Sequence, residues 1–179
     1  MSITVAKSAG FCFGVNRAIN IVNSLLDKNV KVSTLGPIIH NMEVVNELES
    51  RGCKAVDNID EVEKDATLVI RSHGVPKYVI DKLDENGVKY EDATCPFVKK
   101  IHNIVANPDN KDGIVLIAGN SVHPEVEGII GHCSTECHTF KNSEEIDEIY
   151  NIVLKKNNKQ VFVVAQTTFD TKEWKKCVK

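Results

Sequence analysis

The 179-residue sequence predicts an α/β fold made of repeated small parallel-sheet units. Apolar runs rich in Val and Ile alternate with helix-like stretches of about ten residues, which is the pattern of βαβ units. Two segments of the chain also match one another at a constant shift of 83 residues. A constant shift indicates two copies of one supersecondary unit.

Strand-like runs and helix-like stretches alternate through the first half. The runs are short and rich in β-branched residues, whereas the stretches between them carry apolar residues at helical spacing. The predicted strands are Ile3–Ala6, Val30–Thr34, Thr67–Arg71 and a run that starts at Cys53, and the predicted helices are Gly14–Leu26, Asn41–Ser50 and Pro76–Asn86.

The second half repeats this alternation. The predicted strands are Ile114–Ala118 and Val161–Ala165, and the predicted helices are Phe97–Ala106, Ser143–Lys155 and a segment from Asp170 onward. In parallel sheets, the loops at the carboxyl ends of the strands carry the ligand site, because helix N-termini with free N–H groups lie there. Most of the residues that are candidates for a functional site in this sequence fall in such loops.

The internal repeat places a cysteine, a glycine and a histidine at equivalent positions of its two copies. The matched residues are Cys12, Val15, Arg17, Asn20, Ile21, Val22, Gly36 and His40 in the first copy, and Cys95, Val98, Lys100, Asn103, Ile104, Val105, Gly119 and His123 in the second. We therefore expect two lobes, residues 1–95 and 96–179, that share one site.

Composition excludes several functional classes. The net charge is −3 and there is no basic run, so we expect no nucleic-acid partner. No stretch approaches the roughly 18 apolar residues of a membrane span, and the N-terminus lacks a signal pattern, which predicts a cytoplasmic protein without membrane attachment. In that compartment the six cysteines are expected to be metal ligands, catalytic thiols or buried packing residues rather than disulfides.

Cys12 and Cys95 each stand immediately before a predicted helix. The helix dipole and the unpaired N–H groups favour thiolate there, and thiolate is the form that binds metals or attacks electrophiles. A single such cysteine is compatible with simple packing, but repetition at the same shift favours a shared soft metal or an iron–sulfur cluster.

Three histidines follow predicted strands, each with Gly or Pro nearby. His40, His73 and His123 would bring imidazole N–H donors close to helix N-termini, which predicts a pocket for an anion such as phosphate. Taken singly, each could be a surface or capping residue. The sequence has no Gly-rich loop of the nucleotide-binding types.

Two further residues are candidates for proton transfer. Glu125, two residues after His123, is the candidate proton donor, and the alternative is a first-turn glutamate favoured by the helix dipole. Thr167 follows the strand Val161–Ala165 and could position a water or a substrate oxygen, or simply cap a helix.

The other four cysteines are not assigned to the site. Cys53 is expected to be a buried structural thiol and Cys177 a helical residue. Cys133 and Cys137 superficially resemble a zinc pattern but have no distant partner pair, so their roles stay open.

Six motifs together resemble the 4-hydroxy-3-methylbut-2-enyl diphosphate reductase family, also called the IspH or LytB family. They are Ala-Gly-Phe-Cys-Phe-Gly-Val at 9–15, Leu-Gly-Pro-Ile-Ile-His-Asn at 35–41, Arg-Ser-His-Gly-Val-Pro at 71–76, Ala-Thr-Cys-Pro at 93–96, His-Pro-Glu-Val-Glu-Gly at 123–128 and Gln-Thr-Thr at 166–168. The resemblance implies three α/β lobes in a pseudo-threefold trefoil around an oxygen-sensitive [4Fe–4S] cluster. It also implies reductive removal of a hydroxyl from an allylic diphosphate, which gives isopentenyl and dimethylallyl diphosphate in the non-mevalonate pathway.

The same resemblance implies roles for individual residues. Cys12 and Cys95 would be cluster ligands, whereas His40, His73 and His123 would line the diphosphate pocket. Glu125 would start the proton relay to the leaving hydroxyl, with Thr167 beside it in catalysis and substrate binding. Ferredoxin or flavodoxin would supply electrons.

Family members continue through a third lobe that carries the third cysteine ligand, so we expect this chain to be C-terminally truncated and incomplete by itself. Two alternatives stay open. One is a non-redox α/β protein that binds a phosphorylated ligand. The other is a zinc protein that uses Cys12, Cys95 and a histidine, or the pair Cys133 and Cys137.

Overall fold

The computed structural model describes residues 2–7, 9–107, 113–153, 155 and 159–178. Contacts divide the chain into two compact units. Unit 1 comprises residues 1–72 and 89–95, and unit 2 comprises residues 73–88 and 96–179. The sequence-based division differs by keeping residues 73–88 in the first lobe, and the lobe boundaries stay a prediction.

Every paired strand of either unit is parallel to its neighbours, so the predicted α/β fold class with parallel sheets is confirmed. The elements of unit 1 are α1 (Phe13–Leu26), β1 (Val32–Leu35), α2 (Met42–Ser50), β2 (Cys53–Val56), the 3-10 helix η1 (Ile59–Glu61), β3 (Thr67–Ile70) and β4 (Tyr90–Asp92). The elements of unit 2 are α3 (Lys77–Glu85), α4 (Pro96–Val105), β5 (Ile114–Ala118), α5 (Pro124–His132), β6 (Cys137–Phe140), α6 (Ser143–Ile152), β7 (Val161–Ala165) and α7 (Thr171–Cys177).

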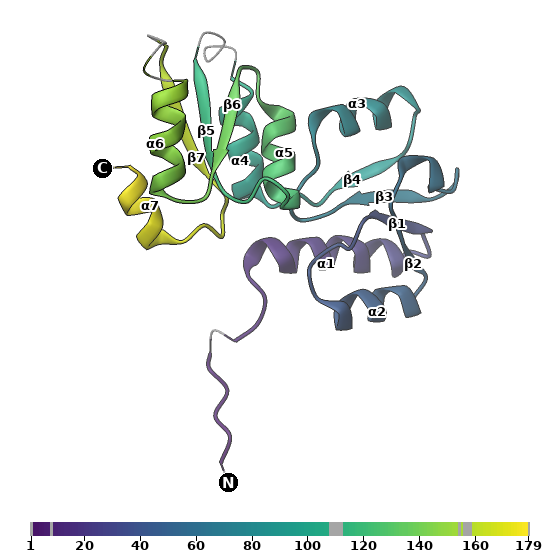
Figure 1. The fold of residues 1–179 in the computed structure, drawn as a ribbon. Helices are drawn as coiled ribbons and strands as arrows, with labels where there is room; N and C mark the ends of the chain where they lie inside the picture. Colours follow the sequence, from purple (N-terminus) through teal and green to yellow (C-terminus); the bar gives the residue numbers. More distant parts are fainter. Residues whose placement is uncertain (1, 8, 108–112, 154, 156–158, 179) are drawn as a thin grey trace. The chain divides into compact units, whose positions relative to one another are not determined.

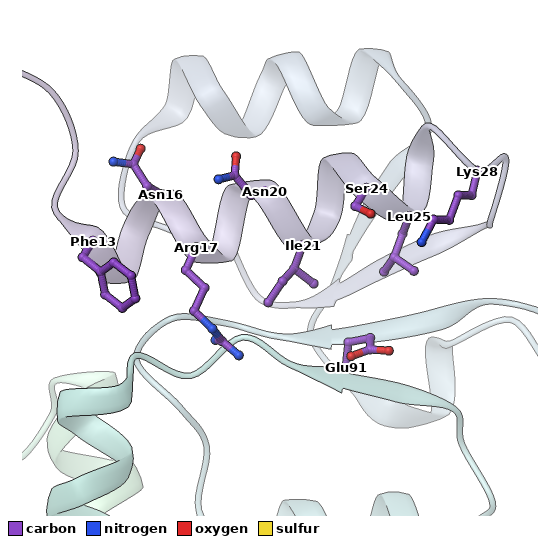
Figure 2. Close-up of a pocket in the computed structure, with 9 residues that line it drawn as sticks. All are labelled: Phe13, Asn16, Arg17, Asn20, Ile21, Ser24, Leu25, Lys28 and Glu91. Carbon is purple, nitrogen blue, oxygen red and sulfur yellow. The ribbon is translucent and has the colours of Figure 1, made fainter.

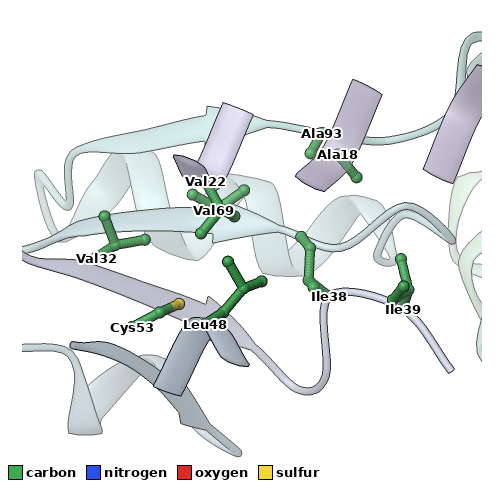
Figure 3. Close-up of a cluster of buried hydrophobic side chains, with 9 residues drawn as sticks. All are labelled: Ala18, Val22, Val32, Ile38, Ile39, Leu48, Cys53, Val69 and Ala93. Carbon is green, nitrogen blue, oxygen red and sulfur yellow. The ribbon is translucent and has the colours of Figure 1, made fainter. Parts of the chain in front are cut away.

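The sheet of unit 1 has the strand order β2-β1-β3-β4. Helices α1 and α2 contribute to its core, because Ala18 and Val22 recur at helical spacing in α1 and Leu48 projects from α2. Figure 3 shows these side chains together with Val32 and Val69 from the central strands. Packing of this face fixes the start of α1, where the first cysteine lies.

The sheet of unit 2 has the strand order β6-β5-β7 (Figure 1). Every residue of β5 is buried. Alternate residues of β5 serve opposite faces, as the pleat requires. Val115 and Ile117 pack in one apolar cluster with residues of α4 and α5, whereas Leu116 packs in another with residues of α6 and α7. A central strand covered by helices on both faces explains its continuous apolar sequence.

The two sheets share a topology that follows the sequence repeat. In each, the strand after the cysteine-led helix is central, and the next strand in the chain pairs on one side of it. The third strand pairs on the other side. The halves of the chain are thus two versions of one supersecondary unit.

The predicted strand Ile3–Ala6 is wrong. These residues form no regular element, and the side chains of Ile3 and Val5 are 91% and 75% exposed. An apolar run becomes a strand only where a neighbouring strand satisfies its backbone groups. Within the described residues, no such neighbour pairs with this run.

Four elements were not predicted as such, namely η1, β4, α5 and β6. The predicted helix Ser143–Lys155 ends earlier, at Ile152, and residue 154 lies outside the described residues. Among the described helices, none has both the length and the apolar character needed to cross a bilayer.

Candidate functional site

Both repeat cysteines belong to unit 1 and meet the same turn of α1. Cys12 is the N-cap residue of that helix and its side chain is exposed. Cys95 is half-buried, and its sulfur lies against Gly14, because a Cβ built at Gly14 would stand 2.6 Å from Cys95 Sγ. The first turn of α1 thus carries one thiol and contacts the other.

Hydrogen bonds hold the segment that carries Cys95 against α1. The Arg17 guanidinium donates to the carbonyl oxygens of Asp92 and Thr94, at 3.2 and 3.3 Å. The backbone N–H of Cys95 donates to the carbonyl of Ser72 at 2.9 Å. Sequence reasoning noted Arg17 only as a repeat match, and its contacts show that it positions the second cysteine.

The donor chemistry of this turn fits an iron–sulfur cluster. Two cysteine side chains with access to solvent lie at one helix start, and cysteine sulfurs are the usual ligands of such clusters. Among the described residues, no three His, Cys, Asp or Glu side chains are grouped to hold a single metal ion.

His40 also belongs to unit 1, in the loop that follows β1. Its side chain is exposed, and the two residues before it, Ile38 and Ile39, are buried in the core. The next residue, Asn41, caps α2 by accepting a hydrogen bond from Val44 N at 3.1 Å. His40 therefore lies immediately before the N-cap residue of α2.

A groove of about 560 Å³ runs along α1 in unit 1 (Figure 2). Its lining comes from one side of the helix and from Glu91 of β4, and Arg17 points from the helix toward that strand segment. None of the predicted site residues lines this groove. It is a feature separate from the cysteines and histidines.

The other predicted residues all belong to unit 2. His73 and His123 contact each other edge to face, with ring centroids 5.6 Å apart and planes at 82°. Both are partly buried. These two imidazoles, 50 residues apart in sequence, therefore lie side by side in the fold.

His123 is the N-cap residue of α5. Its Nδ1 accepts a hydrogen bond from the backbone N–H of Glu125 at 3.1 Å. A ring nitrogen that accepts from an N–H carries no proton, so the neutral ring has its proton on Nε2. In this tautomer Nε2 is the donor nitrogen of the ring.

Glu125 and Thr167 form the tightest polar contact among the predicted site residues. Only 2% of Glu125 is exposed, and its carboxylate accepts from Thr167 N at 2.6 Å and from Thr167 Oγ1 at 2.8 Å. A buried carboxylate is tolerated when its oxygens are bonded in this way.

Neighbouring parallel strands explain why these residues meet. The loops that carry His123 and Thr167 follow β5 and β7, which pair in register, and parallel strands end at the same sheet edge. Gln166 joins the loops, because its backbone N–H donates to Ala118 O at 2.8 Å and its Oε1 accepts from Asn120 N at 3.3 Å.

Sequence reasoning missed two histidines beside this region. His102 of α4 is buried and stacks on His132 of α5, with centroids 4.1 Å apart. His132 Nε2 lies 3.1 Å from the carbonyl oxygen of Val75. The available signal was the position of His102 on the apolar stripe of its helix, with Val98 and Val105.

Comparison with known protein families gives one family match. The model of the LytB protein family matches residues 3–179. Among curated relatives, the 4-hydroxy-3-methylbut-2-enyl diphosphate reductase of Alkaliphilus oremlandii is 43% identical over 173 residues, which cover 96% of this chain and 60% of the relative. The protein of the same name from Clostridioides difficile is 39% identical over 171 residues, with coverages of 95% and 60%.

Solved structures give a consistent result. A structure of (E)-4-hydroxy-3-methyl-but-2-enyl diphosphate reductase, described as the terminal enzyme of the non-mevalonate pathway, matches with a TM-score of 0.82 and 37% identity. The match covers 98% of this chain and 62% of the solved one. The Plasmodium falciparum reductase matches with a TM-score of 0.82 at 29% identity, over 96% and 53% of the two chains. The chain thus spans about 60% of the length of the curated relatives cited above.

Proposed function

The chain belongs to the LytB protein family, and on this premise we propose that it takes part in the reduction of (E)-4-hydroxy-3-methylbut-2-enyl diphosphate to isopentenyl and dimethylallyl diphosphate. The observation that carries the proposal is the pair of thiols at one helix turn, the Cys12 N-cap and the Cys95 sulfur against Gly14. The resemblance seen in the six sequence motifs is confirmed at the level of the family.

Cys12 and Cys95 are proposed as thiolate ligands of a [4Fe–4S] cluster. When bound, such a cluster supplies electrons and a Lewis-acidic iron for the removal of an allylic hydroxyl as water. We propose that the third protein ligand lies in a segment that corresponds to the part of the longer relatives outside the match to this chain. Arg17 supports the arrangement by holding the backbone on either side of residue 93 against α1.

His73 and His123 are proposed to bind the diphosphate, with His40 as a third imidazole. The hydrogen bond from Glu125 N to His123 Nδ1 supports this role, because it keeps a donor on Nε2. The start of α5 adds its own N–H groups and dipole, which favour an anion. Binding of this kind needs no nucleotide-binding loop.

Glu125 is proposed as the proton donor, acting through Thr167. In the observed arrangement Thr167 Oγ1 donates to Glu125 Oε2. If Oε2 is protonated, it can instead donate to Thr167 Oγ1, and the threonine hydroxyl hydrogen then turns toward the substrate. The bond from Thr167 N to Oε1 holds the carboxyl in place during this exchange.

Two further aspects of the proposal concern the cell. The two electrons are proposed to come from a ferredoxin or a flavodoxin, and the location is proposed to be the cytoplasm. A pulldown from the native organism tests the electron donor. Fractionation of its cells tests the location.

Anaerobic reconstitution with iron and sulfide tests the cluster. The chain is expected to gain broad visible absorbance that bleaches in air, and Cys12→Ser and Cys95→Ser are each expected to lose most of it. Cys177→Ser in α7, whose side chain is also partly exposed, is the matched control and should retain it. Iron binding by Cys12→Ser at the level of the unmodified chain would contradict the proposal.

The same experiment separates the alternatives. Stable zinc binding that depends on Cys133 and Cys137 and is indifferent to Cys12→Ser would support a zinc protein. Calorimetric binding of inorganic diphosphate without any cluster formation would support a protein that binds a phosphorylated ligand without redox chemistry.

A further inference from the structure

A second pair of cysteines lies in unit 2 and has no part in the proposed reaction. Cys133 is the C-cap residue of α5, and Cys137 is the first residue of β6. Both are partly buried and both pack against the apolar cluster formed with α4 and α5. Only residues 134–136 separate them, so the pair spans one helix-to-strand turn.

Side-chain and backbone bonds anchor this turn to the neighbouring elements. Ser134 donates from its backbone N–H and from its hydroxyl to the carbonyl of Val105, at 3.1 and 3.3 Å. Thr135 Oγ1 donates to Gly113 O at 2.7 Å, and the carbonyl of Glu136 accepts from Val115 N at 2.9 Å. Because all three connecting residues form hydrogen bonds with neighbouring elements, the turn holds the two cysteines in one arrangement.

The two sulfurs interact directly. The thiol of Cys133 donates a hydrogen bond to the carbonyl oxygen of Ile129 at 3.4 Å, and it also interacts with Cys137 closely enough to shift the pKa values of both thiols. This interaction between the thiols lowers the pKa of Cys137 to about 7 and raises the pKa of Cys133, to which burial also contributes. His138 lowers the pKa of Cys137 further, whereas burial and Glu136 oppose the shift. The pair is therefore asymmetric, with one thiolate stabilised by one thiol.

We propose that Cys133 and Cys137 form a redox-active dithiol that low-molecular-weight disulfides oxidise to an intramolecular disulfide. The two side chains pack against one apolar cluster, their thiols interact, and an anchored three-residue connection holds them together, which is the arrangement that this chemistry uses. Among the described residues, no third His, Cys, Asp or Glu completes a metal site with them. A disulfide needs only the two sulfurs.

The reaction is a thiol–disulfide exchange in two steps. The Cys137 thiolate attacks one sulfur of the small disulfide, so that a mixed disulfide forms and one small thiolate leaves. The Cys133 thiol then gives its proton to solvent, and its sulfur attacks Cys137 Sγ and expels the second small thiolate. Two protein thiols are oxidised and one small disulfide is reduced to two thiols.

Peptide mapping of the full chain tests the proposal with oxidised glutathione as the oxidant. One tryptic peptide, residues 112–141, contains both cysteines and no others. After oxidation and alkylation with iodoacetamide, neither cysteine of this peptide is expected to be alkylated. The mass of the peptide is expected to be that of the reduced, unalkylated peptide minus two hydrogens. Reduction before alkylation should restore alkylation of both cysteines.

Single substitutions separate the two roles. Cys133→Ser is expected to trap glutathione on Cys137, because the resolving thiol is gone, and Cys137→Ser is expected to lose most of the reaction at residue 133. Cys53→Ser, at a core thiol, is the control and should leave the peptide's oxidation unchanged. Circular dichroism checks that each variant is folded.

Peptide mapping of the unmodified chain tests the proposal even if a variant does not fold. Full alkylation of both cysteines in peptide 112–141 would overturn the proposal, provided that the exposed Cys12 becomes glutathionylated under the same conditions. A peptide carrying two glutathiones, without a disulfide between its cysteines, would overturn it as well. Oxidation of this pair alone leaves the proposed cluster function untouched.

Discussion

Gly14 and Cys95 occupy the same small space, with the sulfur of Cys95 where the side chain of residue 14 would stand. A Cβ on residue 14 would lie 2.6 Å from Cys95 Sγ and 3.0 Å from Cys95 Cβ. The absence of a side chain in the first turn of α1 thus lets the second cysteine approach the helix that the first one caps. This close approach gives the site its most direct test.

Gly14→Ala is expected to displace the Cys95 sulfur. Overpacking of this kind costs about 1–3 kcal/mol of unfolding free energy, measurable by urea denaturation, and should reduce iron binding on reconstitution. Asn20→Ala, at an exposed position of the same helix, is the control and should change neither quantity appreciably. Unchanged iron binding by Gly14→Ala would show that the contact has no role in the metal site.

Glu125→Gln is expected to block turnover while leaving the cluster absorbance intact, measured in a chain of full family length. An amide oxygen can accept from Thr167, but the amide NH2 replaces the second acceptor and cannot serve as the acid. Glu127→Gln, at an exposed position of the same helix, is the comparison variant and should retain activity. Loss of the cluster absorbance in Glu125→Gln would mean that the residue is structural.

The two functions assigned to His123 are separable by substitution. His123→Ala removes the cap of α5 and is expected to cost about 1 kcal/mol of stability, whereas His123→Asn can keep a capping acceptor and should cost less. Both should weaken calorimetric binding of inorganic diphosphate, because both remove the Nε2 donor. Diphosphate binding by His123→Asn equal to that of the unmodified chain would argue that His123 is only a cap.

Alkylation of Cys137 is expected to rise with pH through about 7, because the thiolate reacts and the hydrogen bond from Cys133 lowers its pKa to about that value. Cys53 is the internal reference, since burial raises its pKa to about 11 and should keep it protonated and unreactive over the same range. Mass spectrometry of timed iodoacetamide reactions follows both. Coinciding pH profiles would contradict the asymmetry of the pair.

Much of the fold was predictable because local patterns and tertiary pairing agree. The strands Ile114–Ala118 and Val161–Ala165 were predicted with the observed bounds, since both are continuous apolar runs. The strands Tyr90–Asp92 and Cys137–Phe140 carry polar residues and lie at sheet edges, so they lack that signal. Ile3–Ala6 has the signal but no strand to pair with among the described residues.

Helix α5 was not among the predicted helices, although Glu125 was considered as a first-turn residue, and its glycines have low helix propensity. Those glycines serve packing: a Cβ at Gly131 would lie 2.3 Å from the Pro76 side chain, and a Cβ at Gly128 would lie 3.2 Å from His102. Tertiary contact here outweighs the local preference. Such contacts cannot be read from the residues of the helix itself.

The sequence proposes a set of candidate site residues but does not indicate how they are arranged. Repetition singled out Cys12 and Cys95, yet nothing in the sequence indicated that the Cys95 sulfur would lie against Gly14. The contact between Glu125 and Thr167 joins residues 42 apart. It depends on the pairing of β5 with β7, which the sequence suggests only through the general rules for parallel sheets.

The strand order that recurs in the two units bears on how a multi-thiol centre can arise. A tandem copy of one ancestral segment would carry its own cysteine, placed immediately before a helix. Each duplication would then add a ligand without the invention of a new local geometry. Repeated duplication of one ancestral segment can in this way supply several thiolate ligands to one centre.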